Sequence, residues 1–170
     1  MRILKKWTGS FILLPIAVLL VYNNGNFIPL VDHFTLLIHE GGHGIFRIFG
    51  SFIYTLGGSL MQVLIAGLFV FYFYSNKKMF GVQASLVFLA ENLFNISKYA
   101  ADAQAQKLPL LGGNKVYHDW HFLLSKLGIL EYDYLVGYFF ITLAIISLIA
   151  SLLFPLLPKE KEHVHLDLNL

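Results

Sequence analysis

The chain has 170 residues, of which 57% are hydrophobic and only 13% are charged, against about 25% charged residues in an ordinary soluble domain. A soluble fold of this size could not bury so much apolar surface, so the composition argues against a water-soluble enzyme, a disordered chain and a nucleic-acid-binding protein. The formal net charge of +2 is too small to imply an acidic partner, and the absence of cysteine excludes disulfides and thiolate ligands. We expect one membrane-embedded domain at 1–158 and a charged, exposed tail at 159–170.

Apolar segments follow one another along most of the chain. In chain order they cover residues 7–22, 28–49, 52–74, 79–105 and 132–154. No small-residue cleavage site follows the first segment, so we expect a retained span rather than a signal peptide. The third segment carries no charge and is long enough to cross a bilayer. The sequence therefore predicts an all-α integral membrane protein with about four transmembrane helices.

The second segment, 28–49, is apolar but contains several ionisable side chains, so it either crosses the bilayer or re-enters on the same side. The distribution of Lys and Arg leaves both orientations open. If the segment does not cross fully, both termini are cytoplasmic; if it crosses, the last basic cluster moves to the other side. A loop at 107–117 and a short amphipathic helix at 119–130 precede the last span.

A five-residue motif, His39-Glu40-Gly41-Gly42-His43, lies inside this second segment. Positions four apart share one face of a helix, so both imidazoles can bind one metal ion. Glu40 lies about 100° around the helix from His39, where it can reach a metal-bound water rather than the metal. This spacing is typical of zinc hydrolases in which the glutamate takes a proton from the water. The alternative interpretation is a polar patch that packs helices together or lines a water-filled cavity.

Small and polar residues surround the motif. Glycines at 41, 42 and 44 allow close approach by a neighbouring helix or by an extended substrate. Gln62 is a polar side chain in an apolar segment, so we expect it to form a hydrogen bond between helices. The same bond can hold the helix that carries the motif. Asp32 and His33 are interpreted as residues at the membrane interface.

A polar set on the fourth segment, formed by Glu91, Asn92 and Asn95, is interpreted as packing between polar helices. The tail histidines His163 and His165 are interpreted as part of a solvated segment, with adventitious metal binding as the alternative.

A zinc motif in a hydrophobic segment of a small, cysteine-free, multi-span chain resembles the site-2 protease family of intramembrane zinc metallopeptidases. The resemblance covers about residues 34–120, and its specific part is His39, Glu40 and His43. It implies a third zinc ligand, an aspartate from a later helix. The usual Asp-Gly signature of that ligand is absent from this sequence, so the chain resembles a divergent, minimal member of the family.

Three residues are candidates for the third ligand. Asp119 is the first choice, because it begins a helix after a loop containing Pro109 and two glycines, as the family's ligand does. Its alternative role is to cap that helix. His118 and Asp102 are the other candidates.

The expected function is hydrolysis of peptide bonds in membrane-embedded or membrane-adjacent substrates. The expected cofactor is Zn²⁺ bound by His39, His43 and Asp119, with Glu40 as the catalytic base. The expected partners are the lipid bilayer and a membrane protein or peptide, with no nucleic acid; a bacterial inner membrane suits the resemblance. The first alternative is a zinc-binding membrane protein without catalysis, such as a metal transporter, a sensor or an inactive protease relative. The second is a membrane hydrolase that acts on a bond other than the peptide bond.

Overall fold

The computed structural model describes residues 2–109 and 117–157, which fold into helices and connecting turns without any strand. The α-helices are α1 (Arg2–Asn23), α2 (Val31–Phe46), α3 (Ser51–Ser75), α4 (Met79–Ala101), α5 (Asp119–Leu127) and α6 (Asp133–Leu153). The short 3-10 helices are η1 (Arg47–Phe49), η3 (Leu130–Tyr132) and η4 (Phe154–Leu156). The predicted all-α class is confirmed for these residues. The tail expected at 159–170 lies outside the described residues.

Four helical stretches are long and apolar enough to cross a membrane: Lys6–Asn23, Ser51–Ser75, Met79–Ala101 and Leu130–Leu156. This number matches the prediction from the sequence. α2 is not among them. With 16 residues it is about 24 Å long at 1.5 Å per residue, which is shorter than a hydrocarbon core of about 30 Å.

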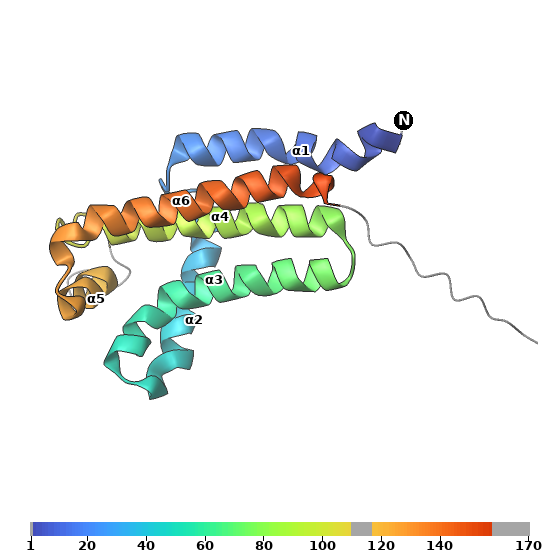
Figure 1. Ribbon diagram of the computed structural model, residues 1–170. Helices are drawn as coiled ribbons and strands as arrows, with labels where there is room; N and C mark the ends of the chain where they lie inside the picture. The colour runs from blue at the N-terminus through green and yellow to red at the C-terminus, as the bar shows by residue number, and fades with distance from the viewer. Residues whose placement is uncertain (1, 110–116, 158–170) are drawn as a thin grey trace, which may run out of the picture.

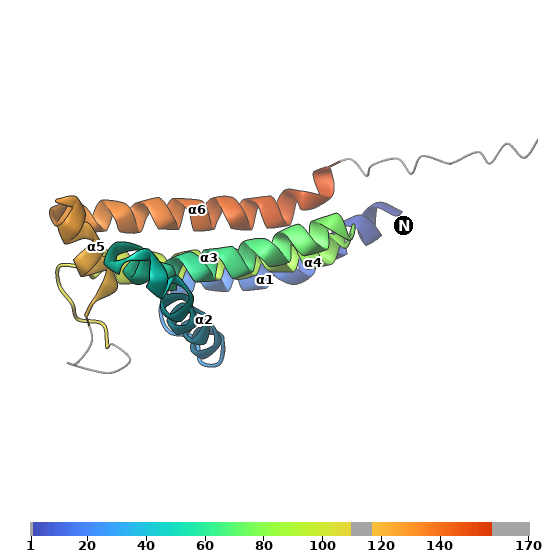
Figure 2. The same cartoon turned by 90° about the horizontal axis from the view of Figure 1, so that it is seen from below.

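The long helices α1, α3, α4 and α6 run side by side, whereas α2 crosses them steeply and α5 lies at one end (Figures 1 and 2). α4 is the central helix, because 56% of its span is buried against at most 28% for each of the others. Apolar side chains of α1, α4 and α6 form one core. A second core joins the end of α4 to α5 around Ile96, Trp120 and Leu123.

A buried glutamine joins three of the long helices. Nε2 of Gln83 donates to Oγ of Ser10 on α1 and to the carbonyl of Ser151 on α6, each over 2.8 Å. The hydroxyl of Ser151 donates back to the Gln83 carbonyl over 2.8 Å. Hydrogen bonds of this kind hold helices together in lipid, where burial of apolar surface gives no net attraction.

α2 packs so closely on α3 that a side chain between them is excluded. A Cβ atom at Gly42 would lie 2.2 Å from the carbonyl oxygen of Gly57, well inside van der Waals contact. Gly42 therefore allows the close approach of a neighbouring helix, which is one of the two roles predicted for the glycines of the motif. Cβ atoms at Gly41 and Gly44 would meet nothing within 4 Å.

The structure differs from the sequence-based expectations in several places. α2 begins at Val31 and α4 ends at Ala101, so each is shorter than its apolar segment. α5 ends at Leu127 because Gly128 takes a left-handed conformation with φ of 69°, which terminates a helix. Asp32, expected at the membrane interface, is buried within the protein with 4% of its surface exposed.

Candidate metal centre

The motif lies on α2, and its two histidines face the same way. The ring centroids of His39 and His43 are 4.8 Å apart, and their Nε2 atoms are 3.2 Å apart. A spacing of four residues on a helix produces this arrangement. His39 is buried and His43 is partly exposed.

Asp119 completes a cluster of three potential ligands. As the first residue of α5, it brings its carboxylate to α2 from 80 positions beyond His39. Its Oδ2 atom lies 2.9 Å from Nε2 of His39 and 3.2 Å from Nε2 of His43. The ligand atoms of the three residues all lie within 4.8 Å of one another. This cluster of His39, His43 and Asp119 is called the triad below.

Helix α3 provides hydrogen-bond partners for the outer nitrogen of each imidazole. Nδ1 of His43 donates to the backbone carbonyl of Tyr54 over 2.8 Å, and Nδ1 of His39 pairs with Oε1 of Gln62 over 3.2 Å. An acceptor at Nδ1 fixes the tautomer in which Nε2 presents its lone pair. Such partners orient metal-binding histidines and raise their basicity.

The triad thus directs two nitrogen lone pairs and one carboxylate oxygen toward a single point. Burial opposes ionisation of Asp119, but hydrogen bonds with His39 and His43 hold the pKa of its carboxyl below the usual range. The hydrogen bond with Asp119 raises the pKa of His43. Without a metal ion these contacts need a proton on Nε2 of a histidine, and a cation held between the three ligand atoms would take the place of that proton. Two imidazoles and one carboxylate suit zinc, and three protein ligands leave a fourth position for water or substrate.

The ring of His39 has space only because a glycine lies opposite. A Cβ atom at Gly58 on α3 would lie 2.5 Å from both Cε1 and Nε2 of that ring. Any side chain at position 58 therefore displaces the imidazole or separates α2 from α3. The sequence shows the glycines of α3 but not that one of them borders this ring.

Several contacts fix the position of Asp119. Its backbone N–H donates to the hydroxyl of Tyr99 over 3.0 Å, which anchors the first turn of α5 to α4. The indole N–H of Trp120 donates to Oγ of Ser59 on α3 over 3.2 Å. α5 is therefore attached to the two helices that flank the triad.

The other two candidates for the third ligand lie near Asp119 but not in the triad. His118 is the N-cap of α5, where Nδ1 accepts the backbone N–H of His121, and burial lowers its pKa. Asp102 accepts the backbone N–H groups of Lys107 and Leu108 over 3.0 and 2.8 Å. Its Oδ2 atom is 3.5 Å from Nε2 of His118. Asp102 and His118 therefore accept hydrogen bonds from the backbone before Asp119 and from the first turn of α5. Neither side chain contributes a ligand atom to the triad.

Glu40 and the triad border one cavity of about 650 Å³. Glu40 is exposed, and the cavity continues along α2 to Asp32 and along α4 to Asn95 and Tyr99. The roles of Tyr54 and Tyr99 were not predicted from the sequence. The Tyr54 contact is made by a backbone carbonyl, which any residue provides, and Tyr99 looks in sequence like an ordinary tyrosine near a helix end.

Comparison of the chain with protein-family models, with curated proteins and with solved structures finds no match.

Proposed function

We propose that this protein is a zinc endopeptidase of the membrane, in which His39, His43 and Asp119 bind the metal and Glu40 is the general base. The observation that carries the proposal is the convergence of three ligand atoms from two distant parts of the chain. The fixed Nδ1 partners of both histidines add support, since polar helix packing alone does not require them.

The chemistry assigned to Glu40 follows from its place beside the triad. A zinc ion held by the triad supplies Lewis acidity, which makes water nucleophilic near neutral pH. The Glu40 carboxylate borders the same cavity, so it can accept a proton from the attacking water. It then returns that proton to the leaving amide nitrogen, so that one water is consumed as one peptide C–N bond breaks.

The setting of the cavity supports a membrane protein or membrane-bound peptide as the substrate. The cavity is bordered by α3 and α4, both long and apolar enough to cross a bilayer. A peptide bond within a helix is shielded by neighbouring turns, so the substrate segment must unwind before cleavage. Helix-breaking residues near the scissile bond should therefore accelerate cleavage, and equal rates for helix-stabilised substrates would contradict this step.

The first test is the zinc content of purified protein in detergent. His163 and His165 are replaced by alanine throughout, so that the tail contributes no zinc. We expect about one zinc per chain, lost in His43→Ala and in Asp119→Ala. His33→Ala is the matched control, because His33 is an exposed histidine of the same helix outside the triad. No zinc in the parent protein, or equal zinc in Asp119→Ala, would overturn the proposed site.

The second test separates an enzyme from a zinc-binding protein without catalysis. Glu40→Gln should keep its zinc and lose hydrolysis of quenched fluorescent peptides in detergent micelles, by a factor of about 10² to 10⁴. Zinc binding by both proteins, with no hydrolysis by the parent against a broad peptide library, would favour the non-catalytic alternative.

A further inference from the structure

A second buried polar cluster lies outside the triad but borders the same cavity through Asp32 and Asn95. It consists of Asp32 in the first turn of α2 together with Glu91 and Asn95 on α4. Asp32 and Glu91 each expose only 4% of their surface. Ionisable groups buried among membrane helices are energetically costly, so each needs a physical explanation.

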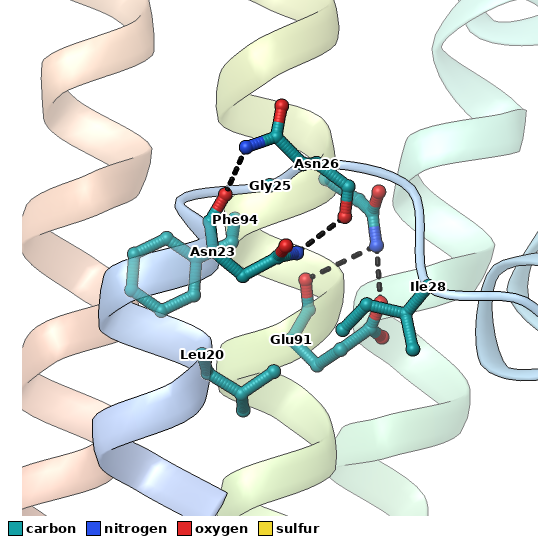
Figure 3. A pocket seen from close by; sticks show the side chains of 8 residues that line it. Leu20, Asn23, Gly25, Asn26, Ile28, Glu91 and Phe94 are labelled. Atoms are coloured by element: carbon teal, nitrogen blue, oxygen red, sulfur yellow. Dashed lines mark hydrogen bonds between the residues drawn. The ribbon is translucent and has the colours of Figure 1, made fainter.

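The two acidic side chains share one donor. Nδ2 of Asn95 donates to Oδ1 of Asp32 over 2.6 Å and also to Oε1 of Glu91. Oδ2 of Asp32 accepts the backbone N–H of Ile28, which comes just before α2. Figure 3 shows Glu91 on α4 beside Ile28 and near the turn that carries Asn23 and Asn26.

The remaining oxygen of Glu91 requires a hydrogen. Oε2 is fully buried and has no hydrogen-bond donor among the described residues. The carboxyl groups of Glu91 and Asp32 both accept from the same Asn95 nitrogen, so they lie close together. Two ionised carboxylates are acceptors only and repel each other, so a buried pair this close is stabilised when one of them keeps its proton.

Among residues 2–109 and 117–157, no cation replaces that proton in the observed contacts. Lys98, two turns beyond Glu91 on α4, donates to Oδ1 of Asn26. His33 on α2 accepts the backbone N–H of Leu30 and packs against the ring of Phe27. The side chains of α1 that border the hollow beside Glu91 are neutral.

Around Glu91 the available space favours a proton over a metal ion, whereas Asp32 and Asn95 also border the cavity of about 650 Å³. The hollow beside Glu91 is too small to admit a water molecule. A Na⁺, Mg²⁺ or Ca²⁺ ion there would need further oxygen ligands, usually including water. The amide nitrogen of Asn95, which is a donor, already occupies the position between the two carboxyl groups.

We propose that Asp32 and Glu91 form a buried proton-binding site, in which one proton shared by the two carboxyl groups joins the first turn of α2 to α4. Loss of this proton leaves two negative charges in contact in the interior, and their repulsion moves the start of α2 away from α4. His39 lies seven residues after Asp32 on the same helix, so the site controls the helix that carries the motif. The proposal does not depend on zinc binding or on peptidase activity.

The experiment is infrared spectroscopy of the full-length protein in detergent, in H₂O and in D₂O. A neutral carboxyl group gives a C=O stretching band, separate from ionised carboxylates, that shifts when its proton is replaced by deuterium. We expect such a band at pH 7 in the parent protein. Incorporation of ¹³C-glutamate should shift it, which assigns it to glutamate without any substitution. Absence of the band at pH 7 would overturn the proposal.

Two variants locate the proton. Glu91→Gln should abolish the band, while Glu131→Gln should keep it, because Glu131 is exposed at the start of η3. In thermal unfolding, the parent should lose stability as alkali removes the proton, and Glu91→Gln should not, since its amide donates to Asp32 at every pH. A band that survives in Glu91→Gln would overturn the assignment. If Glu91→Gln does not fold, the isotope shift decides the question in the parent protein.

Discussion

Nδ1 of His43 lies 2.8 Å from the carbonyl oxygen of Tyr54, an atom that accepts hydrogen bonds and cannot donate them. The hydrogen of the neutral ring is therefore on Nδ1, and the Nε2 lone pair faces the triad. Because Tyr54 makes this contact through its backbone, replacing its side chain leaves the interaction in place. The position of α3 relative to α2, rather than the identity of residue 54, orients the second histidine.

Gly58→Ala should weaken zinc binding. The new Cβ would lie 2.5 Å from the His39 ring, which is held at Nδ1 by Gln62 and at Nε2 within the triad. We expect affinity to fall by about tenfold or more, as for loss of an orienting contact. Zinc titration against a fluorescent chelator measures this change.

The matched control is Gly67→Ala on the same helix, where a Cβ would meet nothing within 4 Å. Its zinc affinity should be unchanged, and its stability should rise by up to about 1 kcal/mol through helix propensity. Equal zinc affinity in Gly58→Ala and Gly67→Ala would contradict the role assigned to Gly58.

Gln62→Leu should reduce zinc affinity by about 10- to 100-fold, because Nδ1 of His39 loses its acceptor and the ring is free to rotate. Gln62→Glu should restore affinity, since a carboxylate also accepts from Nδ1. If leucine and glutamate at this position bind zinc equally well, the hydrogen bond does not orient His39.

Tyr99→Phe removes the acceptor of the Asp119 backbone N–H and keeps the aromatic ring. We expect a loss of about 0.5 to 1.5 kcal/mol in the free energy of unfolding, together with weaker zinc binding because Asp119 is less firmly placed. Tyr138→Phe, at an exposed position of α6, is the control. A change in stability without any change in zinc affinity would limit Tyr99 to a structural role.

Removal of zinc should destabilise the parent protein and leave Asp119→Ala unaffected. A ligand present at about 100 times its dissociation constant stabilises the folded state by about 2.7 kcal/mol. Thermal unfolding with and without a chelator measures the difference as a shift in Tm. An equal shift in Asp119→Ala would show that zinc stabilises the protein at another site.

The helices could be predicted because their signals are local. Long apolar runs bounded by turns gave the four candidate spans, and the motif gave two residues on one helical face. The ends of α2 and α4 depend on individual contacts that an apolar segment does not contain, such as the hydrogen bond between Asp32 and the backbone of Ile28.

The contacts around the triad were harder to foresee. The position of Asp119 depends on Tyr99 and on the packing of Trp120, which bring α5 against α3 and α4. Asp32 was assigned to the interface because an isolated acidic residue usually avoids lipid, whereas its partner Glu91 lies 59 positions further along the chain (91 − 32). A partner this distant becomes apparent only when the helices are placed in space.

The separation of 80 positions between His39 and Asp119 has a consequence for biosynthesis. A nascent chain that has emerged only through α4 contains both histidines and the glutamate but lacks the carboxylate that completes the cluster. Prematurely terminated chains are therefore unable to assemble the triad, even where α2 and α3 are already paired. Synthesis of α5 thus sets the moment at which the triad can first form.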